Sequence, residues 1–161
     1  MMTQWHRMAL LTFLVTSIIQ LSCDDQGDNY IDGSLVKNYN ISFKNVEAVL
    51  VDSGLSIKYN NKKGVAALVV SIKTNSGETS NGIILAKGKT YILEKYGSVT
   101  GFELDLPEIE KGKLTLEEYA KKEGALVQGE FNAKFLPKED EGSQTLRGAF
   151  KTKLKIEISE N

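Results

Sequence analysis

Few side chains in this sequence could act as a nucleophile, a general base or a metal ligand. There is one histidine, His6, and one cysteine, Cys23, and both lie near the N-terminus. A Ser-His-Asp triad, a histidine-bound zinc or haem, and a disulfide bond all need residues that the rest of the chain lacks. Two carboxylates ~5–9 Å apart could still support glycosidase chemistry, but the acidic residues gather in strings such as 139–141, which are typical of solvated loops. We therefore expect no enzyme, no metal site and no cofactor.

The residues before Cys23 have a pattern of their own. Arg7 precedes an apolar run over residues 8–19, and Leu21-Ser22 leads directly into the cysteine. A basic start, an apolar stretch too short for a stop-transfer helix and a small residue before the cut are typical of a secretory signal. The triplet Leu21-Ser22-Cys23 resembles the end of a bacterial lipoprotein signal peptide. The resemblance implies that residues 1–22 are removed and that Cys23 is lipidated. The alternative is a simple N-terminal anchor or an ordinary secretory peptide in which Cys23 is incidental.

Removal of the signal would also change the composition of the chain. Trp5, His6 and all three methionines would leave with it, and 19 basic residues would remain against 21 acidic ones. A protein of this charge lacks the basic excess that nucleic-acid binding needs. We therefore expect no nucleic acid among the partners, and contact with a membrane through the lipid on Cys23.

Residues 23–38 are expected to form the lipidated cysteine and a flexible acidic tether. The stretch is polar, includes Gly27 and Gly33, and shows no sustained hydrophobic period. The alternative for its apolar residues, Tyr30, Ile31, Leu35 and Val36, is that they dock on the domain. Acidic residues after the lipidated cysteine resemble the cell-surface signal of Bacteroidetes lipoproteins. An aspartate directly after it, here Asp24, also resembles the inner-membrane retention signal of enteric bacteria, and a merely solvated tether is the third alternative. The expected address is the cell envelope, with the outer membrane, facing the periplasm or the cell surface, as the favoured place.

The remainder, residues 39–161, is expected to be one all-β domain. Apolar and polar residues alternate along most of it, as in half-buried strands, and Gly, Asn and Asp cluster between the runs. The pattern predicts an antiparallel β-sandwich or flattened β-barrel of about 8–10 strands. The expected strand runs are 41–43, 46–51, 55–59, 65–73, 83–85, 90–93, 99–106, 113–119, 125–136 and 144–159.

One segment fits two structures. Residues 116–123 are helix formers, Thr115 and Glu118 are spaced as in a capping box, and Gly124 stands at a C-cap position. Leu114 and Leu116 alternate with polar residues, however, as in a strand. We favour a strand followed by a tight hairpin, since propensity is a weak guide beside the demand of a sheet for a partner.

A short internal echo lies near the C-terminus. Residues 127–135 and 146–154 share the pattern apolar-x-Gly-x-Phe-x-x-Lys-apolar. The spacing predicts two neighbouring antiparallel strands, in which each glycine lets an adjacent ring or backbone approach closely. A ligand-lining role is the less favoured alternative to this packing role.

These Gly-x-Phe strands, preceded by Gly112-Lys113-Leu114-Thr115-Leu116 and Gly88-Lys89-Thr90-Tyr91-Ile92-Leu93, resemble a group of small Bacteroidetes lipoproteins of unknown function. The resemblance covers roughly residues 65–158. Glu130 and Ala149 stand where threonine is usual. The resemblance implies an all-β domain with a surface or periplasmic address, and it carries over no functional residues.

Two function classes are therefore expected. The first is a non-catalytic binding module for a glycan, a peptide or an envelope protein, with Tyr91 and Tyr96 as speculative ligand-stacking residues. The second is a structural or accessory subunit of a larger envelope complex, joined through an exposed edge strand. A carrier of apolar ligands is a third class, and it would need a large interior cavity.

Overall fold

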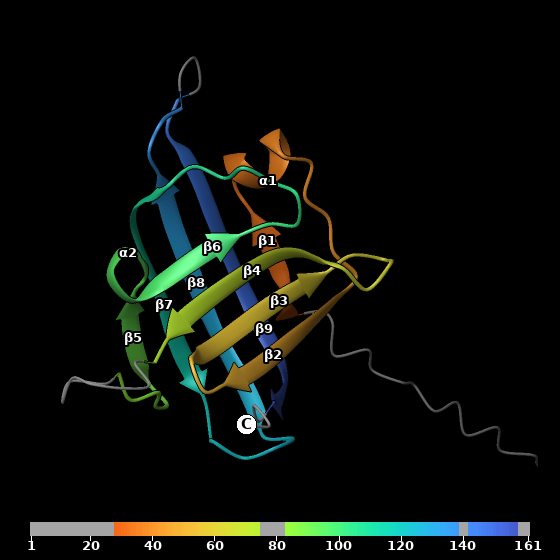
Figure 1. Cartoon of the computed structure of the whole chain (residues 1–161), viewed down its shortest axis with the longest axis vertical. Helices are drawn as coiled ribbons and strands as arrows, with labels where there is room; N and C mark the ends of the chain where they lie inside the picture. The colour runs from red at the N-terminus through yellow and green to blue at the C-terminus, as the bar shows by residue number, and fades with distance from the viewer. Residues whose placement is uncertain (1–27, 75–82, 139–141, 158–161) are drawn as a thin grey trace, which may run out of the picture.

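The computed structural model describes residues 28–74, 83–138 and 142–157, which form a small all-β domain (Figure 1). The described residues contain nine strands and two short helices. In chain order these are β1 (Tyr30–Asp32), α1 (Ser34–Asn38), β2 (Asn45–Val51), β3 (Gly54–Asn60), β4 (Ala66–Lys73), β5 (Lys89–Ile92), α2 (Leu93–Tyr96), β6 (Gly97–Thr100), β7 (Ile109–Glu118), β8 (Leu126–Phe135) and β9 (Gln144–Ile156). Neither helix is long and apolar enough to cross a membrane.

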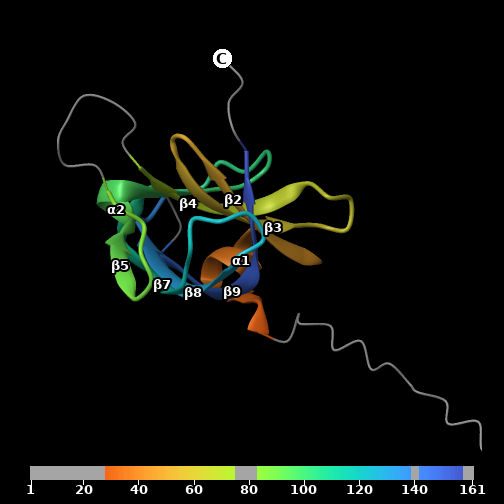
Figure 2. The ribbon, with the colours of Figure 1, turned by 90° about the horizontal axis from the view of Figure 1, so that it is seen from below.

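The strands form one mixed sheet that folds over into two layers. Its order is β5-β7-β8-β9-β2-β3-β4-β6, and β1 pairs with β9 beside β2. Figure 2 shows β5, β7, β8 and β9 in one layer and β2, β3 and β4 in the other. The two ends of the sheet, β5 and β6, are joined by α2, so that the sheet is nearly closed. The prediction of an all-β sandwich or flattened barrel is confirmed.

β9 belongs to both layers. It pairs with β8 in antiparallel fashion over Gln144–Lys153, and its last residues pair with β2 in parallel, from Ala48↔Leu154 to Leu50↔Ile156. The sheet is therefore mixed and not purely antiparallel as predicted. A parallel contact between segments a hundred residues apart leaves no local signal, because no turn connects them.

Two tight hairpins join β2, β3 and β4, and the second of them is the hairpin that the sequence predicts from the turn residues between runs 55–59 and 65–73. β2 and β3 pair in register around Asp52 and Ser53, and β3 pairs with β4 across the turn at 61–65. In that turn the Asn61 side-chain oxygen accepts hydrogen bonds from the Lys63 and Val65 amides, and Gly64 has a φ of 78°. Asparagine and glycine therefore do here what their turn preferences predict.

The internal echo is confirmed as a reciprocal packing motif between β8 and β9. The register places Gly129 opposite Phe150 and Phe131 opposite Gly148. A β-carbon on Gly129 would lie 2.8 Å from Cζ of Phe150, and one on Gly148 would lie 2.6 Å from Cζ of Phe131. Each glycine thus leaves the space that the phenylalanine of the other strand occupies.

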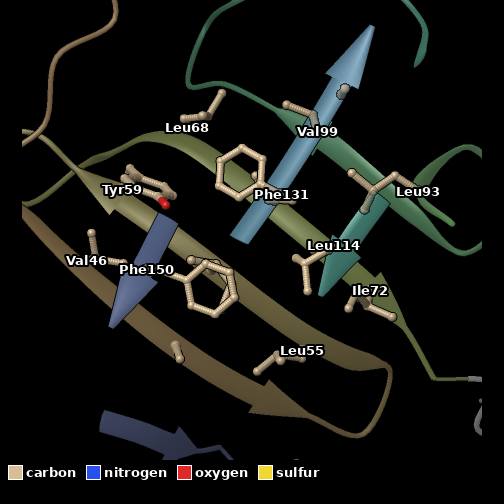
Figure 3. Packing of buried hydrophobic residues seen from close by; sticks show 14 of the residues in the cluster. Val46, Leu55, Tyr59, Leu68, Ile72, Leu93, Val99, Leu114, Phe131 and Phe150 are labelled. Atoms are coloured by element: carbon tan, nitrogen blue, oxygen red, sulfur yellow. The ribbon is translucent and has the colours of Figure 1, made fainter. Parts of the chain in front are cut away.

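These rings meet the opposite layer in the core (Figure 3). The ring of Tyr59, from β3, packs edge-on against Phe131 with 6.0 Å between centroids and against Phe43 with 5.0 Å. The Tyr59 hydroxyl donates a 2.8 Å hydrogen bond to the carbonyl of Ala149 on β9, and burial raises the pKa of this tyrosine. The tyrosine therefore links the two layers by both packing and a buried hydrogen bond.

The N-terminal part of the fold corrects the prediction of a tether over 23–38. Residues from Tyr30 onward belong to the domain as β1 and α1, and Leu35 is fully buried. β1 pairs with β9 from Tyr30↔Ala149 to Asp32↔Arg147. The apolar residues of this stretch are too few for a visible period, yet Ile31, Leu35 and Val36 pack in or against the core. Cys23 and the rest of the predicted tether before Asp28 lie outside the described residues.

Three of the predicted strands also differ from the structure. Residues 41–43 and 83–85 are not strands, and the predicted strand 99–106 ends at Thr100, followed by a turn that a Gly101↔Leu104 bridge closes. Residues 83–86 instead wrap around Tyr91, whose hydroxyl donates to the Ile84 carbonyl and accepts from the Ala86 amide. The ambiguous segment 116–123 continues strand β7 through Glu118 and then turns, as favoured.

Candidate functional site

A shallow groove lies on the outer face of the layer that contains β5, β7, β8 and β9. Its volume is about 780 Å³, and its lining includes residues from these four strands, from β1 and from both helices. The core-facing residues of these strands are buried and the intervening ones are exposed, so that the groove is lined by the solvent-facing set. The sheet therefore determines which side chains meet there.

Two cross-strand rows form the floor of the groove. In the first, Lys113 of β7 lies opposite Asn132 of β8, which lies opposite Arg147 of β9. In the second, Lys111 lies opposite Lys134, which lies opposite Thr145. Side chains in directly opposed positions lie about 4.5–5.5 Å apart at their β-carbons. Four cationic side chains are thus gathered within two adjacent rows.

A β-bulge at the start of β7 contributes to this arrangement. The register shifts between Ile109 and Lys111, and Glu110 and Lys111 are both exposed. Glu110 pairs with Lys134 at 2.6 Å, and this hydrogen bond holds the pKa of Glu110 below its usual value. Bulges commonly re-aim a side chain in this way. The bulge places Lys111 directly opposite Lys134, and the carboxylate of Glu110, also on β7, compensates the charge of Lys134.

Arg147 has its partner on β1. Oδ2 of Asp32 accepts hydrogen bonds from Nε of Arg147 at 3.1 Å and from an Nη at 2.6 Å. The Arg147 guanidinium, followed by the Gly33 amide, lowers the pKa of Asp32. Both groups are exposed, so the pair positions Arg147 and contributes little to stability. Asp32 lies within residues 23–38, which were predicted from the sequence to form a tether.

Three lysines of the groove, Lys37, Lys111 and Lys113, form no ion pair within the part of the chain that the structure describes. The other acidic side chain of the lining is Glu94 of α2, whose Oε2 accepts the Gly112 amide at 2.8 Å. The lining therefore holds five basic side chains against two acidic ones. Such an open, cation-rich surface is suited to bind anions.

The tyrosines predicted as stacking residues lie elsewhere. Tyr91 is 3% exposed, and its hydroxyl is engaged by the 83–86 loop, so its ring cannot stack on a ligand at the surface. Tyr96 is half-buried at the end of α2, with Nζ of Lys95 4.9 Å from its ring centroid. Neither residue lines the groove. Tyr91 is therefore a core residue that holds a loop, which corrects its predicted role.

A second cavity, of about 580 Å³, lies at the other end of the sheet. It is bounded by the β2–β3 turn, residues 83–85, Tyr119 and Ile156, and its lining is largely apolar. Ile84 at this cavity is 73% exposed. The cavity offers a hydrophobic contact surface, and its lining also includes Asp52, Thr74, Lys121 and Glu157.

The groove residues were not predicted from the sequence as candidate site residues. Lys111 and Lys113 alternate with core residues on one strand, which is a visible signal, but Lys134 and Arg147 join them only through the strand order. The acidic string 139–141 and Cys23 lie outside the described residues. Within the described ranges, no group of three Asp, Glu, His or Cys side chains is placed to hold a metal ion.

No protein-family model, no curated protein and no solved structure matches this chain.

Proposed function

We propose that this protein is an envelope lipoprotein anchored through Cys23, whose domain is a non-catalytic binding module for an anionic ligand. The observation that carries the proposal is the groove, where Lys37, Lys111 and Lys113 lie together without an ion-pair partner among the described residues. Lys111 and Lys113 lie on the same face of one strand, β7, and unpaired like charges this close together are unfavourable by themselves. Their cost is offset when an anionic glycan, peptide or envelope protein occupies the groove.

A second candidate is a structural or accessory subunit of an envelope complex. The apolar cavity beside Ile84 and Tyr119 supports this function, because exposed apolar surface commonly marks a protein contact. The sheet edges support it less. β5 and β6 are four residues each, and short edge strands give little backbone for a partner strand to pair with.

The binding function predicts opposite effects for two changes of charge. A sulphated oligosaccharide serves as the anionic glycan, and its affinity is measured by titration calorimetry at low salt. Lys111→Gln with Lys113→Gln is expected to weaken binding by about fivefold for each lysine, since an exposed ion pair is worth up to ~1 kcal/mol. Asp32→Asn is expected to tighten binding, because it frees Arg147 from its partner.

The matched control is Lys62→Gln with Lys63→Gln, in the β3–β4 turn, where neither lysine lines the groove or the second cavity. It removes the same charge and is expected to leave the affinity unchanged. Equal weakening by both double variants, or no saturable binding by the wild type, would overturn the groove as the binding site.

A further inference from the structure

We infer that the anion taken by the groove is the phosphate group of lipid headgroups, in the membrane to which Cys23 is attached. The inference rests on the proposed function, because it requires both the anchor and the binding groove. It follows from how closely the chain is held to the sheet on the C-terminal side of the cysteine.

Asp28 and Asn29, the first two residues that the structure describes, are bound to Lys151 of β9. The Asn29 side chain accepts a 2.6 Å hydrogen bond from the Lys151 amide and donates one to the Lys151 carbonyl, in the manner of an added strand residue. Asp28 itself forms a 2.9 Å ion pair with Nζ of Lys151. Asp28 is the first residue that the structure describes, and only residues 24–27 separate it in sequence from Cys23.

This short link limits how far the domain can stand from the membrane. The five Cα–Cα steps from Cys23 to Asp28 span at most about 18 Å when fully extended. The headgroup region adds roughly 5–8 Å on each side of the hydrocarbon core. The distance between Asp28 and the headgroup region is therefore short for any conformation of residues 24–27.

The groove lies on the same part of the domain as this attachment. β1 follows Asn29 directly, and Asp32 at its end already lines the groove and holds Arg147. The four Cα–Cα steps from Asp28 to Asp32 span at most about 13 Å. The anchor and the cation-rich surface are therefore close enough for headgroups around the anchor to reach the groove.

The charges support recognition by the groove and not by the tether. Asp24 and Asp25 follow the cysteine and repel an anionic surface. Lys37, Lys111 and Lys113 carry compact ammonium groups, which bind phosphate as point charges. Each lysine near an anionic bilayer contributes about 1 kcal/mol, or about fivefold in affinity.

The test uses the chain from Asp24 to Asn161, which lacks the lipid and keeps every described residue. Co-sedimentation compares vesicles of phosphatidylcholine alone with vesicles that also contain phosphatidylglycerol. We expect binding to the anionic vesicles only, weakened about 25-fold by Lys111→Gln with Lys113→Gln. Lys62→Gln with Lys63→Gln is expected to bind as the wild type does.

The remaining outcomes separate the two proposals. Displacement from the vesicles by inorganic phosphate, at a concentration equal to the lipid phosphate, would assign the groove to free phosphate and overturn the lipid inference. Groove-dependent binding of the sulphated oligosaccharide without vesicle binding would overturn it too, while leaving the proposed function intact. If neither partner binds, both proposals fall. Equal losses of vesicle affinity in the two double lysine variants would show that binding depends only on overall charge, and would overturn the inference.

Discussion

Replacing Cys23 with alanine is expected to abolish lipidation and, with it, cleavage of the precursor after residue 22. The thiol is the only one in the chain, so no other residue can accept the diacylglycerol. Each buried methylene contributes about 0.8 kcal/mol, and stable anchoring needs about two chains. Mass spectrometry of the N-terminal peptide measures the result directly: the wild-type peptide begins at an acylated Cys23, and the variant retains residues 1–22.

Two comparisons complete this test. Asp25→Ala keeps the thiol and is expected to stay acylated and in the membrane fraction, whichever membrane it reaches. The chain that starts at Asp24, exported behind a signal peptide that is cleaved without lipidation, is expected in the soluble fraction. A wild-type N-terminal peptide that starts elsewhere, or that carries no lipid, would refute the anchor and the headgroup inference together.

Replacing Gly129 with alanine is expected to lower the free energy of unfolding by about 3 kcal/mol, the upper end for inserting a methyl group into a packed core. The added β-carbon would lie 2.1 Å from the Thr115 carbonyl oxygen and 2.8 Å from Cζ of Phe150. The first contact is with backbone of the neighbouring strand, so a rotamer change of the phenylalanine cannot relieve it. β7 and β8 would have to separate or shift.

Urea denaturation followed by far-ultraviolet circular dichroism measures this loss. Gly142→Ala is the control, because a β-carbon there meets nothing within 4 Å. We expect it to change stability by no more than ~0.5 kcal/mol. A Gly129→Ala variant as stable as the wild type would show that β7 and β8 do not pair in the register described.

The parts of the fold that could be predicted from the sequence are those with local signals. The β2–β3 and β3–β4 hairpins carry turn residues between alternating runs, and the Gly-x-Phe echo predicts the β8–β9 pair. The turn signals depend on residues a few positions apart, and the echo depends on two runs, 127–135 and 146–154, that follow each other along the chain. Their physical causes, turn geometry and alternation, are visible in any single strand.

The parts that could not be predicted depend on contacts between distant segments. β1 has three residues and is a strand only because β9 offers it an edge, and the parallel β2–β9 contact has no connecting turn. The loop at 83–86 has a strand-like composition, but the buried hydroxyl of Tyr91 takes its backbone groups. In each case the tertiary partner decides the local structure.

The candidate site belongs to this second class. Exposed positions on β7, β8 and β9 could be assigned from alternation, yet Lys113, Asn132 and Arg147 form one row only because of the strand order. Aromatic residues attracted the sequence-based prediction because tyrosine commonly contacts sugars. Tyr91 proved to be a core residue because alternation places it on the inward face of β5.

Mapping of amide chemical shifts would locate the binding surface most directly. The chain from Asp24, labelled with ¹⁵N, would be titrated with the sulphated oligosaccharide. The largest shifts are expected at Gly112, Asn132 and Arg147, in the groove on the outer face of β7, β8 and β9. Shifts concentrated at Leu85, Tyr119 and Ile156 would place the ligand in the apolar cavity instead and contradict the groove as the binding site.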